Sequence, residues 1–426
     1  MLPSNPSSGR DRPSLEVADV FRGEAESFLR DYASRLSSQQ KRVFSDIQAC
    51  RTAVMGGHVR ACDHCSHCEI SYNSCRNRHC PKCQAMARAE WLTQREAELL
   101  PIPYFHIVFT LPAEIAALAL QNKRLLYGML FEAASATLSQ VAANPRHLGA
   151  AQIGFLAVLH TWGQNLLHHP HLHCVVGGGG LSEDNSRWIA SRDYYFLPVK
   201  VLSRVFRNKF RHLLQKAFEC GDLGFYGELA HLADPKAFRR FLDAATKRKW
   251  VVYAKRPFRD PACVLKYLAR YTHRVAISNR RLVNYRNGKV TFRYKDYARE
   301  GTQRTMTLTA AEFIRRFLLH VLPDGFMRIR HYGYLANRHR REKLATCRRV
   351  LGCIAPSEPE ADPETAADLP SAEPDGHLGE TEPAILCPAC KTGRMQTIDT
   401  FDRRPRTRER ARPPSPRPSP SYRDTS

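Results

Sequence analysis

The 426-residue sequence lacks any apolar run near the ~18 uninterrupted residues that a membrane-spanning helix needs. Its first residues also lack the apolar core of a secretory signal, so we expect a cytoplasmic protein. The sequence has fewer acidic than basic residues, with 41 Asp and Glu against 65 Lys and Arg, and its formal net charge is +24. This surplus favours a polyanionic partner, and nucleic acid is a better candidate than an anionic membrane surface.

The composition and patterning indicate a folded protein of mixed structure. Apolar residues make up 43% of the chain, which excludes a wholly disordered protein. Helix-forming segments alternate with runs of β-branched and aromatic residues, which predict strands at 104–110, 153–162 and 171–176. Residues 199–248 are typical of a mainly helical insertion. The mixture predicts an α+β fold.

Four parts are expected along the chain. Residues 1–100 would hold an N-terminal helix and a zinc-binding domain, and residues 101–350 the main α+β domain. Residues 351–386 contain nine acidic residues, many prolines and no Lys or Arg, which predicts a disordered acidic linker. Residues 387–426 combine a Cys-x-x-Cys segment with a basic tail that we expect to be disordered.

The cysteines are clustered. Seven of the fourteen lie between Cys50 and Cys83, which indicates metal binding rather than disulfides in a reducing compartment. Two Cys-x-x-Cys pairs, Cys62 with Cys65 and Cys80 with Cys83, can supply four thiolates to one tetrahedral zinc ion. The alternative is a set of buried free thiols. Further candidates for this ion or for a second one are Cys50, Cys68, Cys75 and His79.

Basic residues lie between the expected zinc ligands. Arg76, Arg78 and Lys82 are predicted to face DNA phosphates, with a solvated charged rim as the alternative. Beyond the acidic linker, Cys387 and Cys390 form only half of a tetrahedral site. Closing that half-site takes two more ligands, either the pair Cys347 and Cys353 or partners elsewhere in the chain.

A His-Leu-His sequence lies in one of the predicted strands. Residues i and i+2 of a strand project to the same face, so His171 and His173 can reach one metal ion while Leu172 packs into the core. Gln164, seven residues before His171, is the expected third ligand, and His160 is the second choice. The alternative is a His-x-His pair that arose by chance.

Two tyrosines form the third candidate feature. Tyr267 and Tyr271 lie four residues apart in a predicted helix and therefore share one face. A protonated phenol, whose ordinary pKa is near ~10, is a weak nucleophile, and cationic neighbours favour its phenolate form. Lys266, Arg270 and Arg274 supply positive charge and are expected DNA contacts. The alternative is an aromatic helix face packed on a sheet.

Together these features resemble transposases of the insertion sequence 91 family, the two-tyrosine HUH rolling-circle enzymes. The resemblance covers about residues 15–350. It rests on the stretches CRTAVMGGH at 50–58, YNSCRNRHCPKCQ at 72–84, HTWGQNL at 160–166, HPHLHCVVGGG at 169–179 and YLARYTHRVAISN at 267–279.

The resemblance carries specific implications for fold and site. It implies an N-terminal zinc-binding domain followed by a nuclease domain built on an antiparallel sheet. It also implies that His171 and His173 bind a catalytic divalent ion and that Tyr267 and Tyr271 are the nucleophiles. We expect magnesium or manganese there, because a phosphoryl-transfer site with open positions suits hard ions. DNA would be the partner, as single-stranded element ends and target, in the nucleoid of a bacterial cell.

The expected activity is rolling-circle-type DNA transposition. One tyrosine would attack a metal-polarised phosphate and leave a 5′-phosphotyrosine and a free 3′-hydroxyl, while the second tyrosine holds a second strand. No Walker-type motif occurs, so host factors or supercoiling would unwind the DNA. A zinc-dependent DNA-binding regulator, or a metal-dependent hydrolase without a covalent intermediate, is the alternative.

Overall fold

The computed structural model describes residues 14–84, 98–255, 264, 275–296, 301–353 and 385–403. These residues fall into two compact units. The larger unit takes in the described residues of 14–50 and 75–353, and the smaller unit combines 51–74 with 385–403. No described helix has both the length and the apolar character needed to cross a bilayer.

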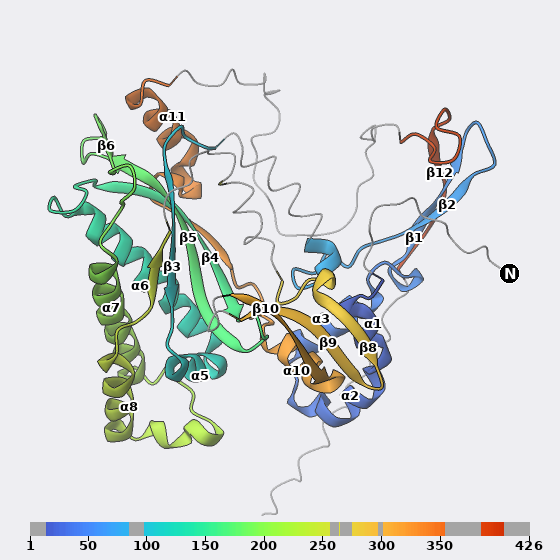
Figure 1. Ribbon diagram of the computed structural model, residues 1–426, viewed down its shortest axis with the longest axis horizontal. Helices are drawn as coiled ribbons and strands as arrows, with labels where there is room; N and C mark the ends of the chain where they lie inside the picture. The colour runs from blue at the N-terminus through green and yellow to red at the C-terminus, as the bar shows by residue number, and fades with distance from the viewer. Residues whose placement is uncertain are drawn as a thin grey trace, which may run out of the picture. The chain divides into compact units, whose positions relative to one another are not determined.

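A sheet of six antiparallel strands forms the centre of the larger unit (Figure 1). The strand order is β11-β4-β5-β3-β7, and β6 pairs with β5 outside this path. This sheet and its helices confirm the predicted α+β class. The strands are β3 (Tyr104–Thr110), β4 (Gln152–Trp162), β5 (His168–Leu181), β6 (Trp188–Ala190), β7 (Val252–Ala254) and β11 (Ile329–Tyr332).

Alternate side chains along these strands build two different cores. Phe109, Leu159 and Leu172 project from one face into the main core, where each fully buried apolar side chain contributes ~1.5–3 kcal/mol. Val158 and Val175 project from the other face into a smaller core that includes residues of α11. The helices are α5 (Ala113–Gln121), α6 (Lys123–Ala143), α7 (Val199–Glu219), α8 (Pro235–Lys247) and α11 (Arg340–Val350).

The N-terminal helices share a third core with residues from the second half of the chain. The ring centroid of Phe21 lies 5.1 Å from that of Phe44 and 5.3 Å from that of Phe317. Phe292 from a second antiparallel sheet belongs to the same core. These contacts cross the domain boundary that was expected at residue 100. The elements are α1 (Val17–Gly23), α2 (Ala25–Tyr32), α3 (Ser38–Ala49), β8 (Leu282–Arg286), β9 (Lys289–Asp296), β10 (Thr302–Thr309) and α10 (Ala310–Leu319).

The smaller unit is a three-stranded sheet with the order β12-β1-β2 (Figure 1). It joins β1 (Gly57–Cys62) and β2 (Cys68–Tyr72) to β12 (Met395–Phe401), which follows more than three hundred residues later. The segment expected to hold a cysteine pair and a disordered tail therefore contains a paired strand. The acidic linker from residue 354 to 384, and the tail after residue 403, lie outside the described residues.

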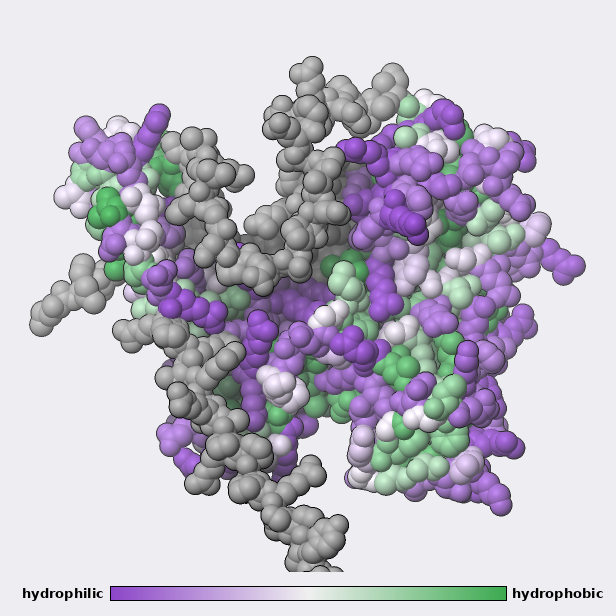
Figure 2. All heavy atoms as spheres, turned by 180° about the vertical axis from the view of Figure 1, so that it is seen from behind, coloured by the Kyte–Doolittle hydropathy of each residue, from purple (hydrophilic) through white to green (hydrophobic). Residues whose placement is uncertain are grey.

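Hydrophilic side chains cover much of the described surface that Figure 2 shows, with apolar patches between them. This surface agrees with a chain in which charged residues make up 25%.

Short 3-10 helices lie at Ala33–Arg35, Ala53–Met55, Gly227–Ala233, Asn279–Arg281, Gly333–Leu335 and Asn337–His339.

Candidate metal centres and catalytic site

The pairing of β4 with β5 decides which histidines meet. His160 lies directly opposite His171, and Val158 lies opposite His173. Directly opposite residues of an antiparallel pair share one face of the sheet, so all three histidines project from the face that carries Val158. Leu172 is fully buried in the main core on the other face, as the alternation along the strand predicted.

The three histidines converge closely enough to hold one metal ion. Ring nitrogens of His160, His171 and His173 all lie within 4.8 Å of one another. The Nε2 atoms of His171 and His173 are 3.1 Å apart, and the rings of His160 and His173 have centroids 4.5 Å apart. Two ligands at right angles, each ~2.1 Å from an ion, are ~3.0 Å from one another. This histidine triad therefore fits a divalent ion.

Hydrogen bonds at the opposite ring nitrogens orient two of these histidines. Nδ1 of His171 donates to the carbonyl of His169 at 2.7 Å, and Nε2 of the same ring is directed at Nε2 of His173. Nδ1 of His173 lies 2.8 Å from Nε2 of His106, whose ring stacks on it at an interplanar angle of 12°. Burial lowers the pKa of His106 to about 3, so His106 is neutral and can accept from His173. A metal-binding histidine is typically oriented in this way.

The expected third ligand, Gln164, and the second choice, His160, have different places in the structure. Gln164 lies in the turn after β4, where its carbonyl accepts a hydrogen bond from Arg281. The turn is tight, because the amide of Gly163 donates to the carbonyl of Leu167 at 2.9 Å. The pairing of β4 with β5 starts next to this turn, where Trp162 lies opposite His168. His160, the second choice from the sequence, takes the place opposite His171.

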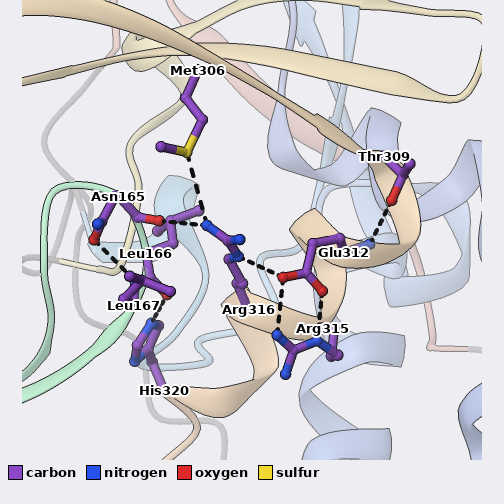
Figure 3. Close-up of polar contacts among 9 residues, drawn as sticks. All are labelled: Asn165, Leu166, Leu167, Met306, Thr309, Glu312, Arg315, Arg316 and His320. Atoms are coloured by element: carbon purple, nitrogen blue, oxygen red, sulfur yellow. Dashed lines mark hydrogen bonds and ion pairs between the residues drawn. The ribbon is translucent and has the colours of Figure 1, made fainter.

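The same turn is fixed to the end of α10 through His320 (Figure 3). Nε2 of His320 donates to the carbonyl of Leu166 at 3.0 Å, and Nδ1 lies 3.2 Å from the hydroxyl of Thr161. Burial lowers the pKa of His320 to about 3, so the neutral ring donates at one nitrogen and accepts at the other. His320 thus connects α10 to both β4 and the turn.

A charged pair on α10 holds the turn at a second point. Arg316 donates to the carbonyl of Asn165 at 3.2 Å and to Glu312 at 2.6 Å (Figure 3). Arg315 contacts both oxygens of Glu312, at 2.6 and 2.9 Å. Hydrogen bonds from Arg315 and then from Arg316 lower the pKa of Glu312 to about 2. The carboxylate therefore stays ionised and keeps Arg316 directed at the turn.

Four cysteines in the larger unit form the first of two sulfur clusters. The Sγ atoms of Cys50 and Cys80 lie 3.6 Å from each other, and the Sγ atom of Cys83 lies 3.6 Å from Cys50 and 3.5 Å from Cys75. Four sulfurs at ~2.3 Å from a tetrahedral zinc ion are ~3.8 Å apart, so this cluster fits zinc. His79 is buried beside it but accepts from a backbone amide and is not a member.

The second cluster lies in the smaller unit and contains Cys62, Cys65, Cys387 and Cys390. The predicted zinc ligands are therefore divided, because Cys62 and Cys65 belong to one cluster and Cys80 and Cys83 to the other. A single ion bound by those four residues does not agree with the structure. Each Cys-x-x-Cys hook was recognised from its spacing, but each hook combines with cysteines outside the predicted set of four.

The basic residues near the first cluster have different surroundings. Arg78 donates to two backbone carbonyls, at 2.6 and 2.8 Å. Lys82 forms an ion pair with Glu16 at 2.5 Å. Arg76 is exposed. Arg78 and Lys82 are thus engaged within the unit, whereas the side chain of Arg76 faces solvent.

The predicted nucleophiles Tyr267 and Tyr271 lie outside the described residues, as do Lys266, Arg270 and Arg274. Val264, three residues before Tyr267, is described and is fully buried. It belongs to the smaller core of the sheet together with Val158 and Val175. Val264 therefore packs on the same face of the sheet from which the histidine triad projects.

Comparisons with known proteins agree with these features. The family described as "Putative transposase" matches residues 154–343, and the family described as "Transposase zinc-binding domain" matches residues 20–111. "Putative transposase y4qJ" of Sinorhizobium fredii is 56% identical over 392 residues, which are 92% of this chain and 96% of that protein. "Transposase for insertion sequence element IS801" of Pseudomonas savastanoi pv. phaseolicola is 30% identical over 296 residues, 68% of each protein.

Among solved structures, the conjugative relaxase TrwC in complex with OriT DNA matches 39% of this chain and 71% of its own, with 17% identity and a TM-score of 0.22. The sequence relatives and family matches show that the chain belongs to the insertion sequence 91 family of transposases, as the sequence motifs predicted. It is accordingly an enzyme that acts on DNA. The zinc-binding match, which contains the whole first cysteine cluster, supports zinc as a cofactor.

Proposed function

We propose that this transposase moves its element by rolling-circle-type transposition, in which it nicks and rejoins single-stranded DNA. The observation that carries the proposal is the convergence of His160, His171 and His173 on one face of the central sheet, near the turn that joins β4 to β5. When a divalent ion is bound there, it supplies polarisation of a phosphate oxygen. Of the two ions expected, three imidazoles favour manganese, because magnesium is usually held by oxygen ligands.

Hydrogen bonds at Nδ1 set the orientation of two of the three histidine rings. His169 and His106 occupy the Nδ1 atoms of His171 and His173, so both Nε2 atoms are directed at the same point. His160 is buried and stacks on Trp162 with an interplanar angle of 20°. The triad is thus fixed before DNA binds, which limits the reorganisation required during the reaction.

Tyr267 and Tyr271 are the proposed nucleophiles. Three residues before Tyr267, the chain is packed through Val264 on the face of the sheet that carries the triad, which supports these tyrosines. The tyrosine oxygen forms a bond to phosphorus while the bond from phosphorus to the 3′ oxygen breaks. The tyrosine loses its phenol proton, the departing 3′ oxygen takes up a proton, and the products are a 5′-phosphotyrosine and a 3′-hydroxyl. The phosphotyrosine keeps the phosphodiester energy, so rejoining needs no ATP.

The remaining basic residues would provide affinity rather than chemistry. We propose that Arg76, Lys266, Arg270 and Arg274 contact phosphates of the single-stranded element ends and target. A zinc ion bound by Cys50, Cys75, Cys80 and Cys83 would hold the segment around Arg76 to the end of α3. Affinity spread over several phosphate contacts makes DNA binding sensitive to salt. Host factors would supply unwound DNA.

The test uses the full-length protein, manganese and a labelled single strand from the ends of the element that encodes it. The expected result is a DNA adduct that survives denaturation. His160→Ala and His171→Ala should each abolish the adduct and retain most DNA binding, whereas His147→Ala, an exposed histidine outside the triad, should leave both unchanged.

Two other outcomes would contradict the proposal. A cleaved strand without an adduct would indicate a metal-dependent hydrolase. A gel shift without cleavage would indicate a zinc-dependent DNA-binding regulator. Gln164→Ala should behave like wild type, because we propose His160, which lies with His171 and His173, as the third ligand.

A further inference from the structure

Two cysteine hooks from opposite ends of the chain meet in the smaller unit. The Sγ atom of Cys62 lies 3.7 Å from that of Cys390, and the Sγ atom of Cys65 lies 3.8 Å from that of Cys387. These separations match the ~3.8 Å between thiolates around one tetrahedral zinc ion and are far longer than the ~2.05 Å of a disulfide. Cys387 follows Cys65 by 322 positions in the sequence.

We propose that Cys62, Cys65, Cys387 and Cys390 bind a second zinc ion that fastens the C-terminal segment 385–403 to the N-terminal β1–β2 hairpin. The family match for zinc binding ends at residue 111 and includes only half of these ligands. The site makes the zinc-binding region a composite of both ends of the chain. It is complete only after Cys390 has been synthesised.

The smaller unit needs such an ion because its described residues have almost no core. Met55, Cys387 and Met395 are the apolar side chains buried there, and none of them joins the three large cores of the protein. Ile70 and Ile398 are 39% and 62% exposed. Small units without a core commonly depend on a structural metal for folding. A metal ion that links residues far apart in the sequence also lowers the conformational entropy of the unfolded chain.

Backbone contacts around the four sulfurs support a metal site rather than a chance meeting of thiols. The amide of His64 donates to Sγ of Cys62, and the amide of Gly393 donates to Sγ of Cys390, both at 3.3 Å. Amide donors of this kind stabilise thiolates and orient metal ligands. Asp63 further joins the hooks, because its carboxylate accepts from the amide of Arg394 at 2.7 Å.

Gly393 shows how closely the two hooks approach. A Cβ atom at this position would clash with Sγ of Cys62 and would lie 2.6 Å from Cβ of His64. Strand pairing continues the same contact, because Met395 lies opposite Cys62 and Gln396 lies opposite Ala61. The absence of a side chain at Gly393 therefore lets the C-terminal hook close on the N-terminal one.

Cys347 and Cys353, the alternative partners for Cys387 and Cys390, have surroundings of their own in the larger unit. Cys347 is fully buried in the smaller core of the central sheet. The thiol of Cys353 donates to the carbonyl of Leu351. The described residues thus offer Cys62 and Cys65 as the thiols that close this half-site.

The experiment counts zinc in the purified full-length protein after extensive dialysis. Three variants are compared with wild type: Cys62→Ser/Cys65→Ser, Cys387→Ser/Cys390→Ser and the quadruple variant. Each double variant should contain one zinc fewer per chain than wild type, and the quadruple variant should lose no more than either double. Cys68→Ser, which removes an exposed thiol of β2 outside the cluster, is the matched control and should keep every zinc.

Hydrogen exchange on the same samples separates this loss from general unfolding. Amides of β1 and β12 should lose protection in each double variant, while those of β4 and β5 in the larger unit keep it. Unchanged zinc in either double variant would overturn the proposal. A quadruple variant that loses two ions would also overturn it, because the hooks would then bind zinc separately. If the β4 and β5 amides lose protection in a double variant, that variant has lost more than the zinc site. Gly393→Ala is then measured in its place, because it keeps all four thiols. That variant should lose the same ion, and retention of the ion would overturn the proposal.

Discussion

Nε2 of His106 lies 2.8 Å from Nδ1 of His173, and the two rings stack with centroids 5.0 Å apart. His106 lies on β3, one strand away from the His-Leu-His sequence, and it is 2% exposed. A neutral His106 can accept a hydrogen bond from Nδ1 of His173 at this distance, and that bond would orient the ring of His173. His106 is therefore a positioning residue for the metal ligand.

Replacement of His106 should weaken metal binding before it affects folding. We expect His106→Ala to lower the affinity of the triad for manganese by ~10–100-fold, as loss of such an orienting partner does elsewhere. His106→Gln, which keeps a hydrogen-bond acceptor, should recover part of the loss. Calorimetric titration of the full-length protein measures this. Equal manganese affinity in wild type and His106→Ala would contradict the positioning role.

The contacts of Glu312 predict how stability depends on pH. Its pKa in the folded protein is about 2, below the ordinary ~4.3, because Arg315 and Arg316 bind the ionised form. Its contribution is therefore complete above pH ~4.3 and disappears as the pH falls through about 2. Glu312→Gln should be less stable than wild type at pH 5, with a difference that shrinks at pH 3.

Urea unfolding at these two pH values tests the contribution of Glu312. Glu26→Gln is the matched control, because Glu26 also pairs with an arginine of its helix but is 93% exposed. An exposed pair of this kind contributes little. If the stability difference for Glu312→Gln were the same at pH 5 and pH 3, the carboxylate would not hold Arg316 as described.

Loss of one cysteine from the first cluster should remove a structural ion from the larger unit. Cys80 is 1% exposed and lies among core residues of α1 and α3. We expect Cys80→Ser to lose one zinc and to lower the free energy of unfolding by more than ~3 kcal/mol, since loss of a buried metal site belongs to the severe class of substitutions. Cys220→Ser, at an exposed cysteine, is the control. Full zinc content in Cys80→Ser would contradict the cluster.

Local spacing predicted the hooks of the metal sites but not how they combine. A Cys-x-x-Cys pair fixes two neighbouring ligands through the geometry of a single turn, so Cys80 with Cys83 and Cys387 with Cys390 were visible in the sequence. Which hooks share an ion depends on the pairing of β1 with β12, two strands that lie at opposite ends of the chain. No local pattern encodes that pairing.

The histidine site shows the same division between local and distant information. The alternation along a strand placed His171 and His173 on one face. The choice between Gln164 and His160 depended on the length of the β4–β5 turn, which the sequence left open. His106 was missed, although a lone histidine within the apolar run YFHIVFT was a usable signal. α1 and α3 bury their apolar faces against α10 and the β8–β10 sheet, across the boundary expected at residue 100, and no local pattern encodes those contacts.

Mapping of the covalent adduct tests the central claim most directly. Full-length protein is incubated with manganese and a labelled single-stranded element end, digested, and sequenced by mass spectrometry. We predict a phosphotyrosine at Tyr267 or Tyr271, an adduct in each single Phe variant, and none in Tyr267→Phe/Tyr271→Phe. Phe keeps the aromatic ring, so loss of the adduct would not reflect a cavity. An adduct at another residue, such as Tyr253, or any adduct in the double variant, would contradict the account.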